Sequence, residues 1–434
     1  MNSHPPAQPG QEMHLTIEEL ASGGDGLARE ESGRVVFVPG ALPGEKVRAK
    51  LAQAKRDFGR AELLEVVEAS PDRVRPVCPL FGECGGCQLQ HLEYAAQVEA
   101  KAAWVRRALS RLGDLPPLVK VPSPKAWEWR HRVRLSVGRQ GLGFLAAASR
   151  RVVPVEVCPV AAPEVNRLLP GLAQGLAKMD TRHVSYLEIL AGEKRSLATV
   201  GLDRGRSLSN RWRGELRRLC RSAGAAATRL EQGGAVEPWE RTPETGVDYW
   251  QEDGLTLSAY PNEFVQANFG ANRELIRLVL GAAASAPEGG VLELYSGGGN
   301  FTLPLAKQGR AVLAVEGDPE SHASAKVLAQ REGLSGQVEL RQAEVAGTAA
   351  ELADQGRGFA LALLDPPRTG AKEVMPSLAA LAPHRIIYIS CHPAALARDA
   401  AMLLQAGYAM HSLAVVDMFP HTGHTEAVLV LDRA

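Results

Sequence analysis

A cysteine at the end of an apolar strand and a glutamate near the carboxyl terminus are the residues best suited to covalent chemistry. Cys391 follows Ile386–Ser390, whose apolar, β-branched and aromatic residues predict a buried strand. Pro393 ends that strand, so the thiol lies at a strand's carboxyl end, where open α/β sheets place their chemistry. Glu426 lies between two predicted strands at the same edge. A thiol and a carboxylate there can serve as nucleophile and base.

A glycine-rich loop indicates the cofactor. Ser296–Phe301 follows the predicted strand at 291–295 and lacks the third glycine of G-x-G-x-x-G. That argues against a dinucleotide and fits a cofactor without phosphate. Glu316 ends the next strand, where a carboxylate can accept both ribose hydroxyls. Together with the strand pattern, these features indicate S-adenosylmethionine.

A proline pair follows a further predicted strand. Asp365–Arg368 reads Asp-Pro-Pro-Arg, and the fixed φ angles of the prolines hold a polar pocket rigid. A related tetrapeptide with an aromatic residue in fourth place serves amino-group methylation of bases, which Arg368 disfavours. The thiol and the carboxylate instead indicate methylation of carbon 5 of uracil. The thiolate adds to carbon 6, the enolate takes a methyl group at carbon 5, and the carboxylate removes the carbon-5 proton.

Three cysteines have the spacing of metal or cluster ligands. Cys78, Cys84 and Cys87 are spaced C-x5-C-x2-C, with glycines between them that allow tight turns. Cys158, followed by proline as Cys78 is, is the candidate fourth ligand. Thiolate ligation suits zinc or an iron–sulfur cluster, and we favour a 4Fe-4S cluster because structural zinc usually shows two paired short spacings. Cys220 has no partner motif and is expected in the core.

The composition limits the class of protein. The 434 residues carry 49 Lys and Arg against 49 Asp and Glu, which excludes a uniformly basic coat but not local basic patches. No apolar run reaches the length of a membrane span, and the amino terminus shows no signal pattern. We therefore expect a cytoplasmic protein without a membrane partner. In that reducing compartment, clustered cysteines point to metal binding or catalysis rather than to disulfides.

The chain divides into four predicted segments. Residues 1–12 are polar and predict a disordered tail, and residues 13–70 predict a small five-stranded OB-like β-barrel with a basic rim that binds RNA. Residues 71–255 predict a central α+β domain with the iron–sulfur site and a helix at 91–112 that could pack on the catalytic domain. Residues 256–434 alternate strands and helices, which predicts the α/β class: a doubly wound, Rossmann-like mixed sheet whose last two strands are antiparallel.

A basic and aromatic cluster precedes the middle of the central segment. Basic side chains at 130–134 alternate with Trp127 and Trp129. Such a cluster could stack on and neutralise a single-stranded nucleic acid, and an ordinary strand with a charged outer face explains it equally well.

The whole chain resembles the RNA uracil-C5 methyltransferase family, in particular its iron–sulfur-containing 23S ribosomal branch. The stretches that carry the resemblance are CPLFGECGGCQLQH, WRHRVRLSV, PNEFVQAN, LYSGGGNFTLPLA, VEGDP, LLDPPRTG, ISCHP and FPHTGHTEAVLVL. The amino-terminal segment resembles the TRAM domain of RNA-modifying enzymes. Two positions depart from the family pattern: His392 stands where Asn is usual, and Ser296 where Cys is usual. An imidazole beside the thiol could assist its ionisation or alter substrate choice.

The resemblance implies roles for named residues. Cys391 would be the nucleophile and Glu426 the base. The residues implied to line the cofactor or base pocket are Gln266, Tyr295, Asn300, Glu316, Glu344 and Asp365. The implied ligands of the 4Fe-4S cluster are Cys78, Cys84, Cys87 and Cys158.

The resulting hypothesis is an RNA (uracil-5-)-methyltransferase that uses S-adenosylmethionine and acts on RNA, with ribosomal RNA favoured. We expect a monomer. The alternatives are a transfer-RNA uridine-C5 methyltransferase, an amino-group methyltransferase that uses Asp365–Pro367, and a non-catalytic RNA-binding cluster protein.

Overall fold

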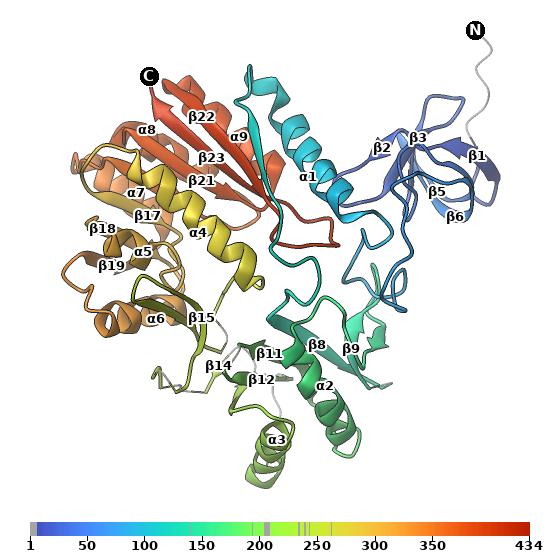
Figure 1. The fold of residues 1–434 in the computed structure, drawn as a ribbon, viewed down its shortest axis with the longest axis horizontal. Helices are drawn as coiled ribbons and strands as arrows, with labels where there is room; N and C mark the ends of the chain where they lie inside the picture. Colours follow the sequence, from blue (N-terminus) through green and yellow to red (C-terminus); the bar gives the residue numbers. More distant parts are fainter. Residues whose placement is uncertain are drawn as a thin grey trace. The chain divides into compact units, whose positions relative to one another are not determined.

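The computed structural model describes residues 7–139, 141–192, 194–203, 209–232, 235–237, 240–242, 244–261 and 263–434. They form two compact units. Figure 1 shows their helices and strands, coloured along the sequence. The first contains the described residues up to Trp104 together with Ala146–Arg150 and Phe419–His424, and the second contains the remainder. The predicted boundaries at residues 70 and 255 lie inside these units, so the four-segment division stays a prediction.

A six-stranded sheet forms the start of the first unit. Its order is β1-β5-β6-β4-β3-β2, with bounds β1 Glu12–Thr16, β2 Glu19–Leu20, β3 Gly26–Arg29, β4 Val35–Val38, β5 Lys46–Ala54 and β6 Phe58–Glu68. Buried and exposed residues alternate along β5, as expected for a sheet with one covered face. Five strands were predicted, and the additional one is the two-residue β2.

The tail predicted to be disordered over residues 1–12 overlaps with residues that pair with the sheet. Residues 1–6 lie outside the described residues, but the N–H of Gly10 donates to Leu51 (2.7 Å), and β1 begins at Glu12. The backbone is therefore tied to the sheet before residue 13, because these hydrogen bonds satisfy its polar groups.

A turn-rich stretch and one helix complete the first unit's main segment. Residues 69–93 contain no strand, and α1 runs over Tyr94–Leu109, followed by the 3-10 turn η1 (Ser110–Leu112). The predicted helix at 91–112 is thus confirmed in its centre. The Trp104 indole N–H donates to the carbonyl of Leu20 (2.9 Å) and packs in a core with Leu42, Leu89 and Leu92.

The second unit begins with a seven-stranded sheet of order β10-β9-β8-β11-β12-β13-β14. Its strands are β8 Arg132–Gly138, β9 Gly141–Leu145, β10 Val152–Pro154, β11 Val184–Ala191, β12 Ser196–Leu202, β13 Ala227–Gln232 and β14 Ala235–Val236, with helices α2 Pro163–Leu176 and α3 Asn210–Ser222. Strands β11 and β12 are neighbours in the sequence and pair antiparallel. A separate two-stranded sheet pairs β15 (Val247–Glu252) with β16 (Leu255–Ala259).

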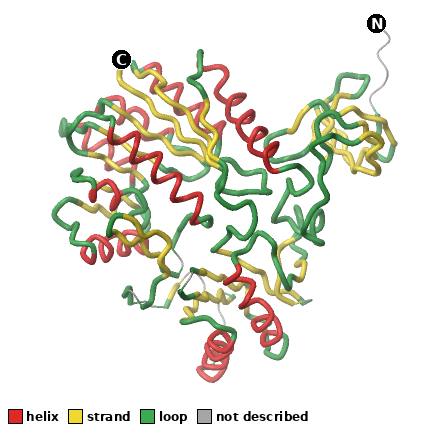
Figure 2. The backbone as a smooth tube through the Cα atoms, in the orientation of Figure 1, coloured by secondary structure: helices red, strands yellow, loops and turns green. Residues whose placement is uncertain are grey.

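An eight-stranded mixed sheet forms the rest of the second unit (Figure 2). Its order is β19-β18-β17-β20-β21-β23-β22-β7, with bounds β7 Leu118–Val121, β17 Val291–Leu294, β18 Val312–Glu316, β19 Val338–Gln342, β20 Leu361–Leu364, β21 Arg385–Ser390, β22 Tyr408–Val416 and β23 Glu426–Arg433. The helices that alternate with these strands are α4 Phe269–Ala284, α5 Thr302–Lys307, α6 Pro319–Arg331, α7 Val345–Asp354, α8 Met375–Leu381 and α9 Pro393–Gln405, with the 3-10 turn η2 Lys372–Val374.

The predicted doubly wound mixed sheet is confirmed. Strands β17 to β21 are parallel, and β23 is antiparallel to both of its neighbours. The unpredicted member is β7, which pairs parallel with β22 although it lies far away in the sequence. Within the described residues, no helix is long and apolar enough to cross a membrane.

Candidate active site

The strand register brings the predicted chemistry to one edge of the eight-stranded sheet. Leu294 pairs with Val315 and Leu364, and Leu364 pairs with Tyr388, so the carboxyl ends of these parallel strands lie together. Strand β23 runs the opposite way, and Ser390 pairs with Ala427. Cys391 and Glu426 therefore occupy adjacent positions at the ends of neighbouring strands.

The thiol of Cys391 is half-buried at the start of α9. Burial, followed by the negative charges of Glu426 and Asp365, raises its pKa to about 11, while the charge of Arg368 opposes the shift. Each carboxylate repels the thiolate, so both act on the acidity of the same sulfur. At neutral pH the thiol is therefore protonated.

The residue after the thiol caps a helix. His392 precedes α9, and its Nδ1 accepts a hydrogen bond from the N–H of Ala395 (3.3 Å). Asn is a strong capping residue for the same reason, because its side chain also offers an acceptor to the first turn. The imidazole thus supplies the capping interaction that Asn would provide.

The charges of two carboxyl groups, the buried Glu426 and the partly buried Asp365, act on the thiol. Glu426 is 3% exposed, and its Oε1 has no hydrogen-bond partner within the described residues. Burial, and then the charge of Asp365, raises the pKa of Glu426 well above its ordinary value. Burial also raises the pKa of Asp365 to about 7, although a hydrogen bond from Gln266 lowers it. A buried polar atom without a partner marks a place where a ligand can supply one.

The glycine loop lies between β17 and α5. Gly297 and Gly299 have φ of 56° and 92°, a backbone conformation that is sterically strained for residues with a Cβ atom. The N–H of Gly297 donates to Oε2 of Glu316 (2.8 Å), so the loop and the end of β18 are joined. The hydroxyl of Ser296 is buried without a partner within the described residues.

Asn300 and Tyr295 flank this loop. The side chain of Asn300 forms a reciprocal amide pair with Asn272 of α4, at 2.8 and 3.1 Å. Tyr295 has φ of 63°, and burial raises its pKa to about 12. The site therefore combines a thiol, two carboxyl groups with raised pKa values and a glycine loop.

Comparison with known proteins identifies the family. A model described as TRAM domain matches residues 6–64, and one described as tRNA (Uracil-5-)-methyltransferase matches residues 245–340 and 351–434. The 23S rRNA (uracil(1939)-C(5))-methyltransferase RlmD of Klebsiella pneumoniae subsp. pneumoniae is 36% identical, covering 98% of this chain and 96% of its own. The protein of the same name from Xanthomonas oryzae pv. oryzae is 37% identical, covering 97% of each. The chain belongs to the RNA uracil-C5 methyltransferase family.

A solved structure supports the fold of this methyltransferase. The Pyrococcus abyssi tRNA (uracil-54, C5)-methyltransferase, solved with S-adenosyl-L-homocysteine, matches with a TM-score of 0.77 at 24% identity. The match covers 96% of this chain and 100% of that one. The predicted family and fold class are both confirmed.

Glu344 has a structural role in this methyltransferase. It lies exposed after β19, where its carboxylate caps α7 by accepting from the N–H groups of Ala346 (2.8 Å) and Gly347 (2.6 Å). These bonds, Gly347 first, lower its pKa. The cap accounts for the position of the Glu344 carboxylate without any bound ligand. A role for Glu344 in the cofactor or base pocket therefore stays a prediction.

Glu263 is a residue that the sequence analysis missed. It is 3% exposed, accepts from Arg241 (3.1 Å) and the Ser324 hydroxyl, and receives the N–H of Tyr260 (3.3 Å). These bonds hold the segment that carries Gln266. The neighbouring Phe264 is 68% exposed, which is unusual for a ring beside a polar pocket. The run Pro-Asn-Glu-Phe was the available signal, but local pattern does not distinguish the inward acid from the outward ring.

The candidate cluster cysteines are distributed between the two units. Cys78, Cys84 and Cys87 lie in the first unit and Cys158 in the second. Around Gly82 (φ 89°), the N–H of Cys84 donates to Leu80 (2.9 Å), which forms the predicted tight turn. Within the described residues, no group of three or more His, Cys, Asp or Glu side chains is arranged to hold a metal ion. The cluster therefore stays a prediction.

Proposed function

We propose that this enzyme methylates carbon 5 of a uridine in 23S ribosomal RNA, using S-adenosylmethionine and a covalent bond from Cys391 to the base. The observation that carries the proposal is the pairing of Ser390 with Ala427, which places the thiol and Glu426 at adjacent strand ends. The ribosomal substrate is favoured because the relatives that cover nearly the whole chain are named as 23S rRNA methyltransferases.

In the proposed reaction, Cys391 adds to carbon 6 of the uracil and leaves an enolate whose carbon 5 is nucleophilic. S-adenosylmethionine supplies an electrophilic methyl group to that carbon. Glu426 then takes the carbon-5 proton, the electron pair of the C–H bond reforms the ring double bond, and the Cys391 thiolate leaves carbon 6.

Proton transfers by the chain's own residues follow from the acidities in the site. Because the pKa of Cys391 is raised to about 11, the thiol must lose its proton when the uracil binds. Asp365, whose pKa is raised to about 7, is the coupled carboxyl group best matched to accept a proton near neutral pH. A raised pKa likewise makes Glu426 a stronger base than an ordinary glutamate.

The glycine loop and the end of β18 are the proposed cofactor site, together with Gln266, Tyr295 and Asn300. The unpartnered hydroxyl of Ser296 and the positive φ of Gly297 and Gly299 fit a polar ligand held close to the backbone. Both oxygens of Glu316 already accept one backbone N–H. Each retains a further lone pair that can accept from a ribose hydroxyl.

Incubation with a 23S RNA fragment and labelled S-adenosylmethionine tests this function. The wild type should form 5-methyluridine, Cys391→Ala should form none, and Glu426→Gln should accumulate a covalent RNA adduct that survives denaturation. Cys220→Ala removes a buried thiol that the mechanism does not use and serves as the control. Methylation by Cys391→Ala would refute the covalent mechanism and favour an amino-group methyltransferase. Mass spectrometry of 23S and transfer RNA from cells lacking the protein decides between the two RNA classes.

We further propose a 4Fe-4S cluster on Cys78, Cys84, Cys87 and Cys158. The C-x5-C-x2-C spacing and the tight turn at Gly82 support it. Protein purified without oxygen should contain iron and acid-labile sulfide, and Cys84→Ser should lose both whereas Cys220→Ser retains them. Stoichiometric zinc without sulfide would contradict the proposal. The remaining parts of the proposal are RNA binding by the amino-terminal sheet, a cytoplasmic location and a monomeric enzyme.

A further inference from the structure

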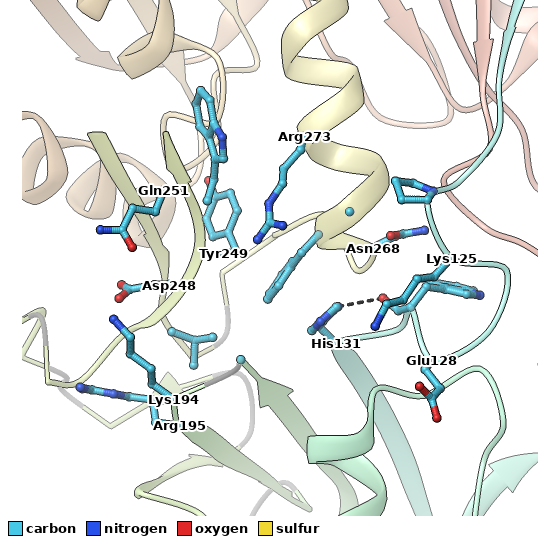
Figure 3. A pocket seen from close by; sticks show the side chains of 17 residues that line it. Lys125, Glu128, His131, Lys194, Arg195, Asp248, Tyr249, Gln251, Asn268 and Arg273 are labelled. Carbon is cyan, nitrogen blue, oxygen red and sulfur yellow. Dashed lines mark hydrogen bonds between the residues drawn. The ribbon is translucent and has the colours of Figure 1, made fainter. Parts of the chain in front are cut away.

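A second pocket lies within the second unit, and none of its lining residues belongs to the predicted site. It encloses about 240 Å³, close to the lower end of ligand sites, which span ~300–1,000 Å³. Its walls come from residues 124–131, the turn between β11 and β12, strand β15 and the start of α4 (Figure 3). Segments far apart in the sequence therefore build one enclosed space.

The pocket carries more positive than negative charge. Four basic side chains line it, Lys125, Lys194, Arg195 and Arg273, against the carboxylates of Glu128 and Asp248. Asp248 already accepts a hydrogen bond from the Ser258 hydroxyl (2.6 Å).

Two of these cations approach the pocket from different elements. Lys194 comes from the turn after β11 and Arg273 from α4 (Figure 3). No ion pair joins either side chain to a carboxylate within the part of the chain that the structure describes. Cations that converge on one space and outnumber the carboxylates there indicate an anionic ligand.

Aromatic rings form another part of the lining. Phe269 stacks on His131, with centroids 4.2 Å apart and planes 14° apart, and Tyr249 packs against Phe269 at 5.5 Å. The Nδ1–H of His131 donates to the carbonyl of Trp129 (2.8 Å), and burial lowers the pKa of the imidazole. The imidazole is therefore neutral at neutral pH and offers a flat ring rather than a charge. Rings beside cations are the combination that recognises a base and its phosphate.

The pocket is close to the reacting site along the chain. Asn268 lines it, and Gln266, which bonds Asp365, lies two residues earlier. Two residues span at most ~7 Å. The amide of Asn268 also donates to Ser123 (2.9 Å) and to the carbonyl of Met418 (3.2 Å), which ties this segment to its neighbours.

We propose that the pocket binds a nucleotide of the substrate RNA other than the methylated uridine. The phosphate lies among Lys194, Arg195 and Arg273, and the base lies against the rings of Phe269, His131 and Tyr249. This inference rests on the proposed function, because it assigns the pocket to the same RNA.

Charge-removing variants test the pocket. Lys194→Gln and Arg273→Gln should each raise the Kd for an RNA stem-loop several-fold in fluorescence anisotropy. Each should also reduce the slope of log Kd against log salt by ~0.7–0.9, the value for one lost phosphate contact. At saturating RNA, kcat should stay within about two-fold of the wild type, because the reacting residues are untouched. Arg277→Gln is the matched control, since Arg277 lies one turn further along α4 and pairs with Glu252 and Glu274.

The outcomes separate this inference from the proposed function. Unchanged RNA affinity and salt slope in both variants, with unaltered thermal unfolding, would overturn the pocket assignment while methylation by the wild type continues. Lys194→Glu, at an exposed position, gives a second and stronger perturbation of the same kind. Equilibrium dialysis of the wild type and the variants with free adenosine and uridine monophosphates measures the binding of nucleotides that are not part of an RNA. Variants that lose only free nucleotide, with RNA affinity intact, would also overturn the assignment to RNA.

Discussion

Replacing Glu426 with Gln should make Cys391 more acidic even though it abolishes turnover. Burial is the largest cause of the raised pKa of Cys391, and the charge of Glu426 comes next. The shift from 9.0 to about 11 corresponds to ~3 kcal/mol against the thiolate. At pH 8 it reduces the thiolate from roughly 10% to roughly 0.1% of the molecules.

Gln removes the charge of Glu426 but leaves burial and Asp365 in place. We therefore expect only part of the shift to disappear, lowering the pKa of Cys391 by ~0.5–1 unit. Because the thiolate is the reactive form, alkylation at pH 8 should become ~3–10 times faster.

The assay is iodoacetamide labelling of the RNA-free enzyme between pH 6 and 10.5. Mass spectrometry of the peptide that contains Cys391 separates this thiol from the other five cysteines. Glu288→Gln serves as the control, because Glu288 is an exposed carboxylate and is not among the groups acting on Cys391. A profile in Glu426→Gln that is unchanged, or that moves to higher pH, would refute the proposed electrostatic coupling.

Three further predictions concern a helix cap, a buried glutamate and a buried amide. His392→Asn should keep the cap of α9 and the activity, whereas His392→Ala should lower the free energy of unfolding by ~0.5–2 kcal/mol in urea titrations; equal stabilities would show that the cap is unimportant. Burial raises the pKa of Glu293 to about 8 from 4.5, so the folded state holds this proton more tightly and stability falls as pH rises from ~5 to ~8. Glu293→Gln should flatten that fall in melting temperature, and a fall as steep as in the wild type would contradict the assignment. Gln97→Leu should cost ~1–3 kcal/mol, because it removes the buried amide that donates to the carbonyl of Leu92 (2.8 Å), and thermal melts will measure the loss.

Much of the fold could be predicted from local patterns in the sequence. Residues 386–389 are apolar or aromatic because β21 is buried on both faces, and every residue of β21 is buried in the structure. The glycine loop followed by α5, and the alternation of strands and helices after residue 290, are similarly local. Periodicity and turn residues act over a few positions, so they can be read without knowing the fold.

Contacts between distant segments were decided only by the tertiary structure. Pattern alone did not reveal that β7 joins the sheet beside β22, nor that Ser390 pairs with Ala427 so that Glu426 lies next to the thiol. Glu344 is predicted to line the cofactor or base pocket, and the structure adds that its carboxylate caps α7, an interaction that the sequence pattern did not reveal.

The basic and aromatic pocket likewise depends on three segments coming together: residues near 125–131, the turn that carries Lys194 and Arg195, and β15 with the start of α4. By itself, the sequence determined where strands end and which side chains stand there. Register, burial and the resulting acidities arise when distant strands pair and exclude water, which is a property of the packed chain and not of any short stretch of it.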